Sequence, residues 1–143
     1  MIGAIQDITK QKEEEQRLRL LETVITQSKD SILITEANSV DRRIPKIVYV
    51  NPAFSHMSGY LSHEIIGKSP NIFKGPKSDS EELKKLLRAI KNEEECVIET
   101  ITYTKSKEEY WVRFAMIPIF NNEGVITHWI SIQRDITDEK KLE

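Results

Sequence analysis

Two segments of the chain carry apolar residues every three or four positions, which is the spacing of a helix with one apolar face. The first, residues 8–28, is almost entirely charged or amide-bearing in its first half, and a stripe follows at Leu18, Leu21, Val24 and Ile25. The second, residues 78–92, has four apolar positions at i, i+3, i+4 and i+7 starting from Leu83. We expect Ser78 or Ser80 to cap the start of this second helix.

Alternating or continuous apolar runs predict five strands. Two short runs, residues 31–37 and 46–51, flank a loop rich in turn-forming and charged residues. Three longer runs follow the second helix, at residues 96–106, 109–120 and 124–136. The connections between these last three are short, which is typical of antiparallel hairpins.

Proline and glycine interrupt the chain every few residues between Pro52 and Pro76. They leave room only for helices of one or two turns, at about residues 52–58 and 62–66. Asn51 is a suitable start for the first of these, because proline is tolerated in the first turn of a helix. The whole order predicts an α+β domain, in which a five-stranded antiparallel sheet carries its helices on one face.

Composition narrows the setting of this domain. The chain has 143 residues, of which 38% are hydrophobic, so one globular domain with a tail is expected. The net charge of −2 argues against a nucleic acid as the main partner. No apolar run is long enough for direct membrane insertion, and no secretory signal opens the chain, so a cytoplasmic location is expected. The single cysteine, Cys96, excludes an intrachain disulfide.

The segment IVYVNPAFSHMSGYLSHEIIGK, residues 47–68, resembles the core stretch of the PAS sensor family, and GPKSD and THWISIQRDIT match the same family further on. The similarity spans about residues 22–137. Within the family the chain is most similar to the light-oxygen-voltage (LOV) branch, judged by GKSPNIFKGPKSD, TYTKSKEEYW and IQRDIT. The resemblance implies the PAS fold, preceded by a linker helix, and a sensory role in signal transduction.

The triplet Asp-Ile-Thr occurs twice, at residues 7–9 and 135–137. In PAS proteins this triplet closes the last strand and begins the linker to the next module. We therefore expect residues 1–21 to be an inter-domain linker helix with the end of a preceding PAS module. Residues 22–137 then form the PAS domain, and residues 138–143 begin a C-terminal linker helix. The alternative is an ordinary strand-to-helix cap that occurs twice by chance.

The LOV resemblance implies a flavin site between the sheet and the broken helical stretch. Pro70 stands where that branch has its photoactive cysteine, and Cys96 is no substitute, so the covalent photocycle is not expected. Val112 stands where the family has a side chain that hydrogen-bonds the ring, and it offers no such group. The candidate ligand-binding residues are Thr35, Asn51, Asn71, Phe73, Lys74, Thr102, Val112, Phe114 and Gln133.

The ligand itself stays open. The cofactor is unidentified, with a flavin (FMN or FAD) as one candidate for a non-covalent redox or light sensor. Haem is not expected, because the long helix lacks the ligand histidine of haem PAS sensors. Neither a metal site nor a catalytic residue is predicted, since His56 and Cys96 belong to no catalytic motif. In the runner-up interpretation the domain serves only dimerisation and spacing. Its pocket is then filled by Ile72, Phe73, Val112, Phe114 and Met116.

The leading interpretation is a signalling module. Binding of a ligand or partner, or a redox change, would pass through the last two strands to Asp135, Ile136 and Thr137 and on to the linker helix. The output domain, a two-component histidine kinase or a cyclic-dinucleotide enzyme, would lie outside this chain. The stripe on residues 8–28 predicts a homodimer through that helix, either parallel or antiparallel.

Overall fold

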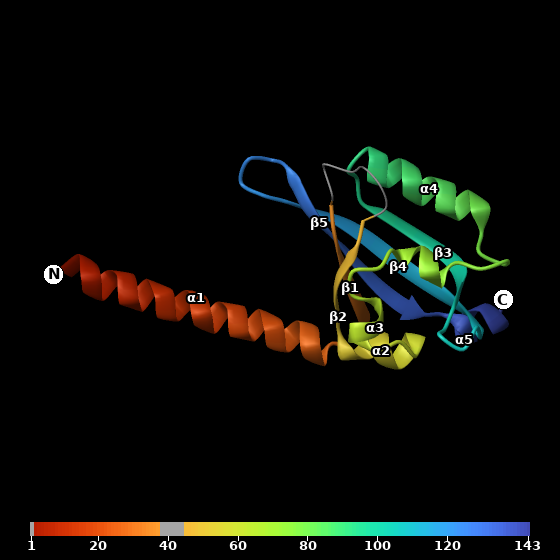
Figure 1. The fold of residues 1–143 in the computed structure, drawn as a ribbon, viewed down its shortest axis with the longest axis horizontal. Helices are drawn as coiled ribbons and strands as arrows, with labels where there is room; N and C mark the ends of the chain where they lie inside the picture. Colours follow the sequence, from red (N-terminus) through yellow and green to blue (C-terminus); the bar gives the residue numbers. More distant parts are fainter. Residues whose placement is uncertain (1, 38–44) are drawn as a thin grey trace.

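The computed structural model describes residues 2–37 and 45–143, with side chains from residue 8 onward. One antiparallel sheet lies at its centre, with the strands in the order β2-β1-β5-β4-β3 (Figure 1). The strands are β1 (Ser31–Glu36), β2 (Ile47–Val50), β3 (Cys96–Tyr103), β4 (Glu109–Phe120) and β5 (Ile126–Asp135). The predicted α+β fold with a five-stranded antiparallel sheet is confirmed. The predicted loop between the first two strands lies, except for Pro45, outside the described residues.

The helices are α1 (Ile2–Gln27), α2 (Pro52–Ser58), α3 (Ser62–Ile65), the 3₁₀ helix η1 (Pro70–Phe73), α4 (Ser80–Lys91) and α5 (Thr137–Lys141). Helices α2, α3 and α4 contact β1, β2 and β3 respectively. Helix α1 extends away from the sheet as a rod, and α5 lies at the opposite end of the molecule (Figure 1). The loops and short helices thus cover the sheet, while both terminal helices remain outside the core.

Two buried apolar clusters support the sheet. One joins β1 and β2 to the short helices, through Leu33, Ile47, Val50, Phe54 and Ile65. The other joins α4 to β3, through Ala89, Cys96 and Ile98. The two clusters are separate, and Leu33 of the first cluster and Phe114 beside the second both border the space between them.

The local capping predictions have mixed outcomes. Asn51 caps α2 as predicted, since its side chain accepts a hydrogen bond from the Phe54 N–H. The predicted cap of α4 is wrong. Asp79, rather than Ser78 or Ser80, accepts the N–H groups of Glu81 and Glu82. The hydroxyl of Ser78 is engaged elsewhere, because it donates to the Ile101 carbonyl oxygen at 2.8 Å.

Two further boundaries differ from the prediction. Helix α1 begins at Ile2 rather than at residue 8, so the first Asp-Ile-Thr triplet lies within a helix and not at the end of a strand. Strand β3 ends at Tyr103 instead of residue 106, because Thr104 and Lys107 close a turn in which Lys107 has φ 69°. Both predicted hairpins are present, since β3 pairs with β4 and β4 with β5, each antiparallel.

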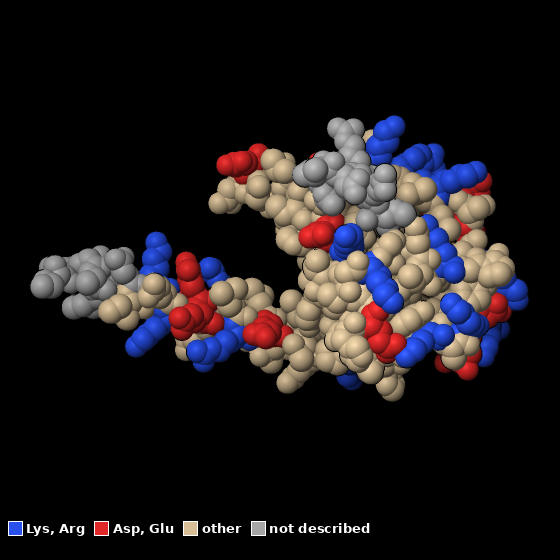
Figure 2. Space-filling model, in the orientation of Figure 1, with Lys and Arg blue, Asp and Glu red and all other residues tan. Residues whose placement is uncertain are grey.

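The apolar stripe of α1 is exposed to solvent. Leu18, Leu21 and Val24 are 64%, 52% and 60% exposed, while Ile25, near the domain, is half-buried. Acidic and basic side chains alternate along the same rod (Figure 2). No helix in the described part of the chain is both long and apolar enough to cross a membrane.

Candidate functional site

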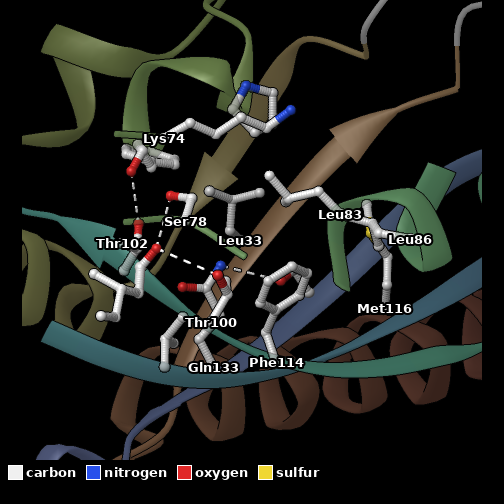
Figure 3. A pocket seen from close by; sticks show the side chains of 15 residues that line it. Leu33, Lys74, Ser78, Leu83, Leu86, Thr100, Thr102, Phe114, Met116 and Gln133 are labelled. Atoms are coloured by element: carbon white, nitrogen blue, oxygen red, sulfur yellow. Dashed lines mark hydrogen bonds between the residues drawn. The ribbon is translucent and has the colours of Figure 1, made fainter. Parts of the chain in front are cut away.

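A pocket of about 100 Å³ lies between η1, α4 and strands β1, β3, β4 and β5 (Figure 3). Its wall is mostly apolar, and it separates the two core clusters. The apolar lining residues are Leu33, Pro70, Phe73, Leu83, Leu86, Ile101, Val112, Phe114 and Met116, and the polar ones are Lys74, Ser78, Thr100, Thr102, Ser131 and Gln133. A partly enclosed apolar cavity with a few polar groups is the usual form of a small-molecule site.

Six of the nine predicted ligand-binding residues line this pocket. They are Phe73, Lys74, Thr102, Val112, Phe114 and Gln133. Ser131 and Thr100, which are 3% and 4% exposed, also line the pocket and were not predicted. Their signal was present, because alternate residues of a strand share one face, and these two residues are two positions from Gln133 and Thr102.

The other three predicted residues lie outside the lining. Asn51 is fully buried and binds backbone groups of α1, β1 and α2. Thr35 is also fully buried, and its Oγ1 has no hydrogen-bond partner among the described residues. Asn71 is exposed on η1. The first two side chains therefore belong to the interior of the fold and the third to its surface.

The polar groups of the wall are mostly bound to the protein itself. Thr102 Oγ1 donates to the Phe73 carbonyl oxygen at 2.9 Å, and Ser78 Oγ donates to that of Ile101 (Figure 3). Thr100 Oγ1 accepts the Asp79 N–H at 2.7 Å and donates to the Ile101 carbonyl oxygen at 3.5 Å. Few buried polar groups of the wall are therefore without a protein partner, and an unpaired one would be costly.

Ser131 and Gln133 differ from these groups because they bind each other. The Gln133 amide donates to Ser131 Oγ at 3.1 Å across the face of β5. A hydroxyl keeps its own hydrogen after accepting a bond, and the carbonyl oxygen of the amide stays available as an acceptor. This pair thus offers an occupant of the pocket both a hydrogen-bond donor and an acceptor.

The described pocket does not fit a flavin. An engineered cavity of about 150 Å³ holds a single benzene ring, whereas a flavin has three fused rings and the pocket measures about 100 Å³. Val112, which is 2% exposed, gives the wall an apolar surface where the resemblance implies a hydrogen-bonding partner. Pro70 lies in the wall, while Cys96 is buried at the start of β3 outside the lining. No group of three or more His, Cys, Asp or Glu residues in the described chain could hold a metal ion.

The predicted relay residues connect β5 to α5 directly beside the pocket. Asp135 pairs with Val112, and its Oδ1 accepts hydrogen bonds from the N–H and the Oγ1 of Thr137, at 2.9 and 2.6 Å. Thr137 Oγ1 in turn accepts the Trp111 N–H at 3.0 Å, and the N–H of the buried Ile136 donates to the Trp111 carbonyl oxygen. The end of β5 and the start of α5 are thus held to the residue that precedes Val112.

Helix α5 is also held by charged side chains on the outer face of the sheet. Lys140 Nζ lies 2.9 Å from Glu99 Oε1 and 4.8 Å from the centre of the Trp111 ring. Arg113 binds the other carboxylate oxygen of Glu99 at 2.7 Å. The hydrogen bond from Lys140, followed by that from Arg113, lowers the pKa of Glu99, and the bond to Glu99 raises the pKa of Lys140.

Comparison with known proteins places this geometry in a family. Residues 29–138 match the family described as PAS domain. A blue-light-activated histidine kinase of Brucella canis is 33% identical over 108 residues, which are 76% of this chain and 22% of that protein. The same kinase of Rhizobium johnstonii is 30% identical over 97 residues, 68% of this chain and 28% of the relative. The chain spans about a fifth to a quarter of the length of these relatives.

Solved structures agree on the fold. An RNA-binding light-oxygen-voltage receptor superposes on 85% of this chain with a TM-score of 0.78 and 24% identity, and the match covers 34% of that receptor. A light-oxygen-voltage domain studied with a flavin analogue gives 0.75 and 19% over 85% of this chain and 87% of its own. With the matching segment and the five-stranded topology together, the chain belongs to the PAS domain family, and it shares the fold of light-oxygen-voltage domains.

Proposed function

We propose that this domain is a sensory module in which the occupancy of the pocket changes how α5 is held. The observation that carries this proposal is the pairing of Val112 with Asp135. Val112 lies in the pocket wall, and its partner on the neighbouring strand, Asp135, binds Thr137. Gln133, also in the wall, precedes Asp135 by two residues on the same strand. A small movement of the wall therefore reaches the start of α5 through one or two residues.

The output follows from the hydrogen bonds at this junction. An occupant that shifts Val112 or Gln133 alters the bonds among Asp135, Thr137 and Trp111, and so favours either the docked or the released position of α5. A ligand transmits a signal only through its different affinity for these two arrangements. Burial, followed by the negative charge of Asp135, raises the pKa of Tyr110. Its hydroxyl therefore stays protonated beside the junction.

In the whole protein, the module acts on a covalently linked output domain. The relatives named as histidine kinases favour a two-component kinase over a cyclic-dinucleotide enzyme for this role. The sensory domain itself takes no catalytic part, and the protein works in the cytoplasm. We include in this proposal the predicted roles of the pocket and relay residues. We also include the predicted domain limits at residues 21 and 137 and the predicted preceding PAS module.

Two variants test the coupling. Ser131→Leu fills the pocket without touching α5, and it should change the hydrogen-exchange rates of the α5 amides as an occupant would. Adding Thr137→Val, which removes the hydroxyl that accepts the Trp111 N–H, should abolish that response. Exposed Glu123, in the turn before β5, provides the control Glu123→Gln. Unchanged α5 exchange in a folded Ser131→Leu protein would refute the proposal.

A second candidate function is assembly, as a ligand-free PAS domain used for dimerisation and spacing. The exposed apolar stripe of α1 favours it, because a second copy of α1 would cover Leu18, Leu21 and Val24. We propose this helix as the homodimer contact in either case. Leu21→Glu should convert a dimer into a monomer in sedimentation velocity, whereas Leu142→Glu, at an 89% exposed position, should not. A wild-type protein that stays monomeric at high concentration would rule out the contact.

The names of the relatives favour a third candidate, a non-covalent flavin sensor of redox state or light. A flavin stays among the candidates for the unidentified cofactor on that ground, although the pocket would have to open to admit it. Protein purified from a flavin-sufficient host decides the matter. A bound flavin, released on denaturation, would support this candidate, and its absence would exclude it.

A further inference from the structure

The size and lining of the pocket restrict the class of molecule that it can bind. We propose that the occupant is a small uncharged molecule, with a carbon skeleton of about one ring and a single hydroxyl or similar polar group that binds Ser131 and Gln133. This inference rests on the proposed function, since it names the ligand of the same pocket. It departs from the flavin that the LOV relatives suggest.

The volume sets the upper limit. A rigid cavity of about 150 Å³ accepts one benzene ring, and this pocket has about 100 Å³. Three of its wall residues, Leu83, Leu86 and Phe114, are only half-buried and can shift outward by a small amount. One ring is therefore accommodated by local adjustment, whereas several fused rings would require α4 to separate from the sheet.

The wall sets the polarity. Leu33, Val112 and Met116 are each at most 7% exposed and form its deepest apolar part. Transfer of an apolar ring from water to such a surface is favourable by roughly 25 cal/mol per Å². A charged group would lose its hydration there, and the one charged lining residue, Lys74, has an exposed side chain. The apolar surface therefore selects an uncharged skeleton.

The hydrogen-bonding groups set the position of the polar end. The hydroxyls of Thr100, Thr102 and Ser78 already bind backbone groups, which belong to Asp79, Phe73 and Ile101 respectively. Among the described residues, the side chains of Ser131 and Gln133 bind only each other, so they retain a hydroxyl hydrogen and an amide oxygen. A ligand hydroxyl can accept from the first and donate to the second, so both groups are used by a single substituent.

Phenol and toluene form a matched pair of probes, because they differ in one hydroxyl and have nearly the same size. We expect phenol to shift the amide resonances of Val112, Phe114, Ser131 and Gln133 saturably in ¹H–¹⁵N NMR spectra of the full chain. Toluene should bind at the same place more weakly, by roughly two- to tenfold, which corresponds to one net hydrogen bond. Flavin mononucleotide and benzoate should not bind there.

Variants of the wall separate the contributions. Gln133→Leu should lower the affinity for phenol toward that for toluene, because only the Ser131 hydroxyl remains to bind the ligand hydroxyl, and Ser131→Leu should abolish the binding of both. Glu123→Gln, outside the pocket, should leave both affinities unchanged. The same spectra report whether each variant is folded. If Ser131→Leu does not fold, the reduced phenol preference of Gln133→Leu still tests the assignment.

Three outcomes would overturn the inference. They are no saturable shift with phenol up to its solubility limit, equal affinities for phenol and toluene, and tight binding of flavin mononucleotide or benzoate in the same pocket. The proposed function is judged separately, by the exchange rates of the α5 amides. A flavin that binds and changes α5 exchange would refute the small ligand alone, whereas phenol that binds without such a change would refute the signalling role alone.

Discussion

Replacement of Asn51 by alanine should destabilise the domain more than the same replacement of an exposed asparagine, because the Asn51 side chain joins three elements. Its Oδ1 accepts the N–H groups of Ile32 and Phe54, at 2.9 and 3.0 Å, and its Nδ2 donates to the carbonyl oxygens of Ile25 and Asp30, at 3.1 and 3.0 Å. The side chain is fully buried. All four bonds are lost in Asn51→Ala.

Each of these bonds contributes about 1 kcal/mol net, so the upper sum is about 4 kcal/mol. The Phe54 N–H also bonds the backbone oxygen of Asn51 at 3.1 Å, and that bond survives the substitution. We therefore expect a loss of about 2–4 kcal/mol in the free energy of unfolding, a large share of the ~5–15 kcal/mol typical of a domain. Urea denaturation followed by the fluorescence of the buried Trp129 measures this loss.

Two variants make the test specific. Asn71→Ala removes an exposed asparagine whose side chain has no hydrogen bond to any described residue, and it should change the stability by less than about 0.5 kcal/mol. Asn51→Asp keeps both accepted bonds but turns a carboxylate toward the Ile25 and Asp30 carbonyl oxygens. Burial and these oxygens should favour the protonated form of the new carboxyl in the folded state, so the variant should regain stability as the pH falls. If Asn51→Ala loses less than about 1 kcal/mol, or Asn51→Asp is as stable as the wild type at neutral pH, the reasoning is wrong.

Further predictions concern single contacts. A Cβ at Gly75 would overlap the ring of Tyr103, so Gly75→Ala should destabilise by roughly 1–3 kcal/mol, and by much less when Tyr103→Ala is also present. The carboxylate of Glu99 has a pKa below its ordinary 4.5, because Lys140 and then Arg113 bind it. Its contribution is therefore present above that value and lost as the pH falls through the lowered pKa. The protection factors of the α5 amides, which are exchange rates corrected for the intrinsic effect of pH, should therefore fall in acid, and Glu99→Gln should remove this dependence. The hydroxyl of Thr35 is buried and has no hydrogen-bond partner among the described residues. Thr35→Val should therefore raise the midpoint of thermal unfolding by an amount equivalent to about 1 kcal/mol. A lower midpoint would contradict this expectation.

Features that depend on neighbouring residues could be predicted from the sequence. The spacing of apolar residues located the strands and α4, since one buried face is enough to define each of them. The Asn-Pro pair located the start of α2, because proline is tolerated in the first turn of a helix. Strand alternation placed Val112 and Phe114 on one face, and both line the pocket.

Features that depend on tertiary contacts could not be predicted from the sequence. Ser78 is a good helix cap in isolation, but its hydroxyl meets the Ile101 carbonyl oxygen only after β3 is in place, and Asp79 then caps α4. Asn51 was predicted to line the pocket, whereas its side chain instead binds backbone groups of α1, of Asp30 and of β1. The volume of the pocket depends on how far Leu86 and Phe114 project into it, which no pattern along the chain records.

The two junctions with the terminal helices have a mechanical consequence. Ser31, at the start of β1, is paired with Gln133, near the end of β5, and Asp30 lies 3.6 Å from Arg134 in an ion pair. Tension applied between positions 27 and 137 would therefore open this strand pair like a zip, loading one hydrogen bond at a time instead of shearing the whole ladder. Single-molecule pulling should show a low rupture force at this point, and a high force would contradict the geometry. A tether drawn between the two terminal helices would thus separate β1 from β5 before it disturbed α4 and β3.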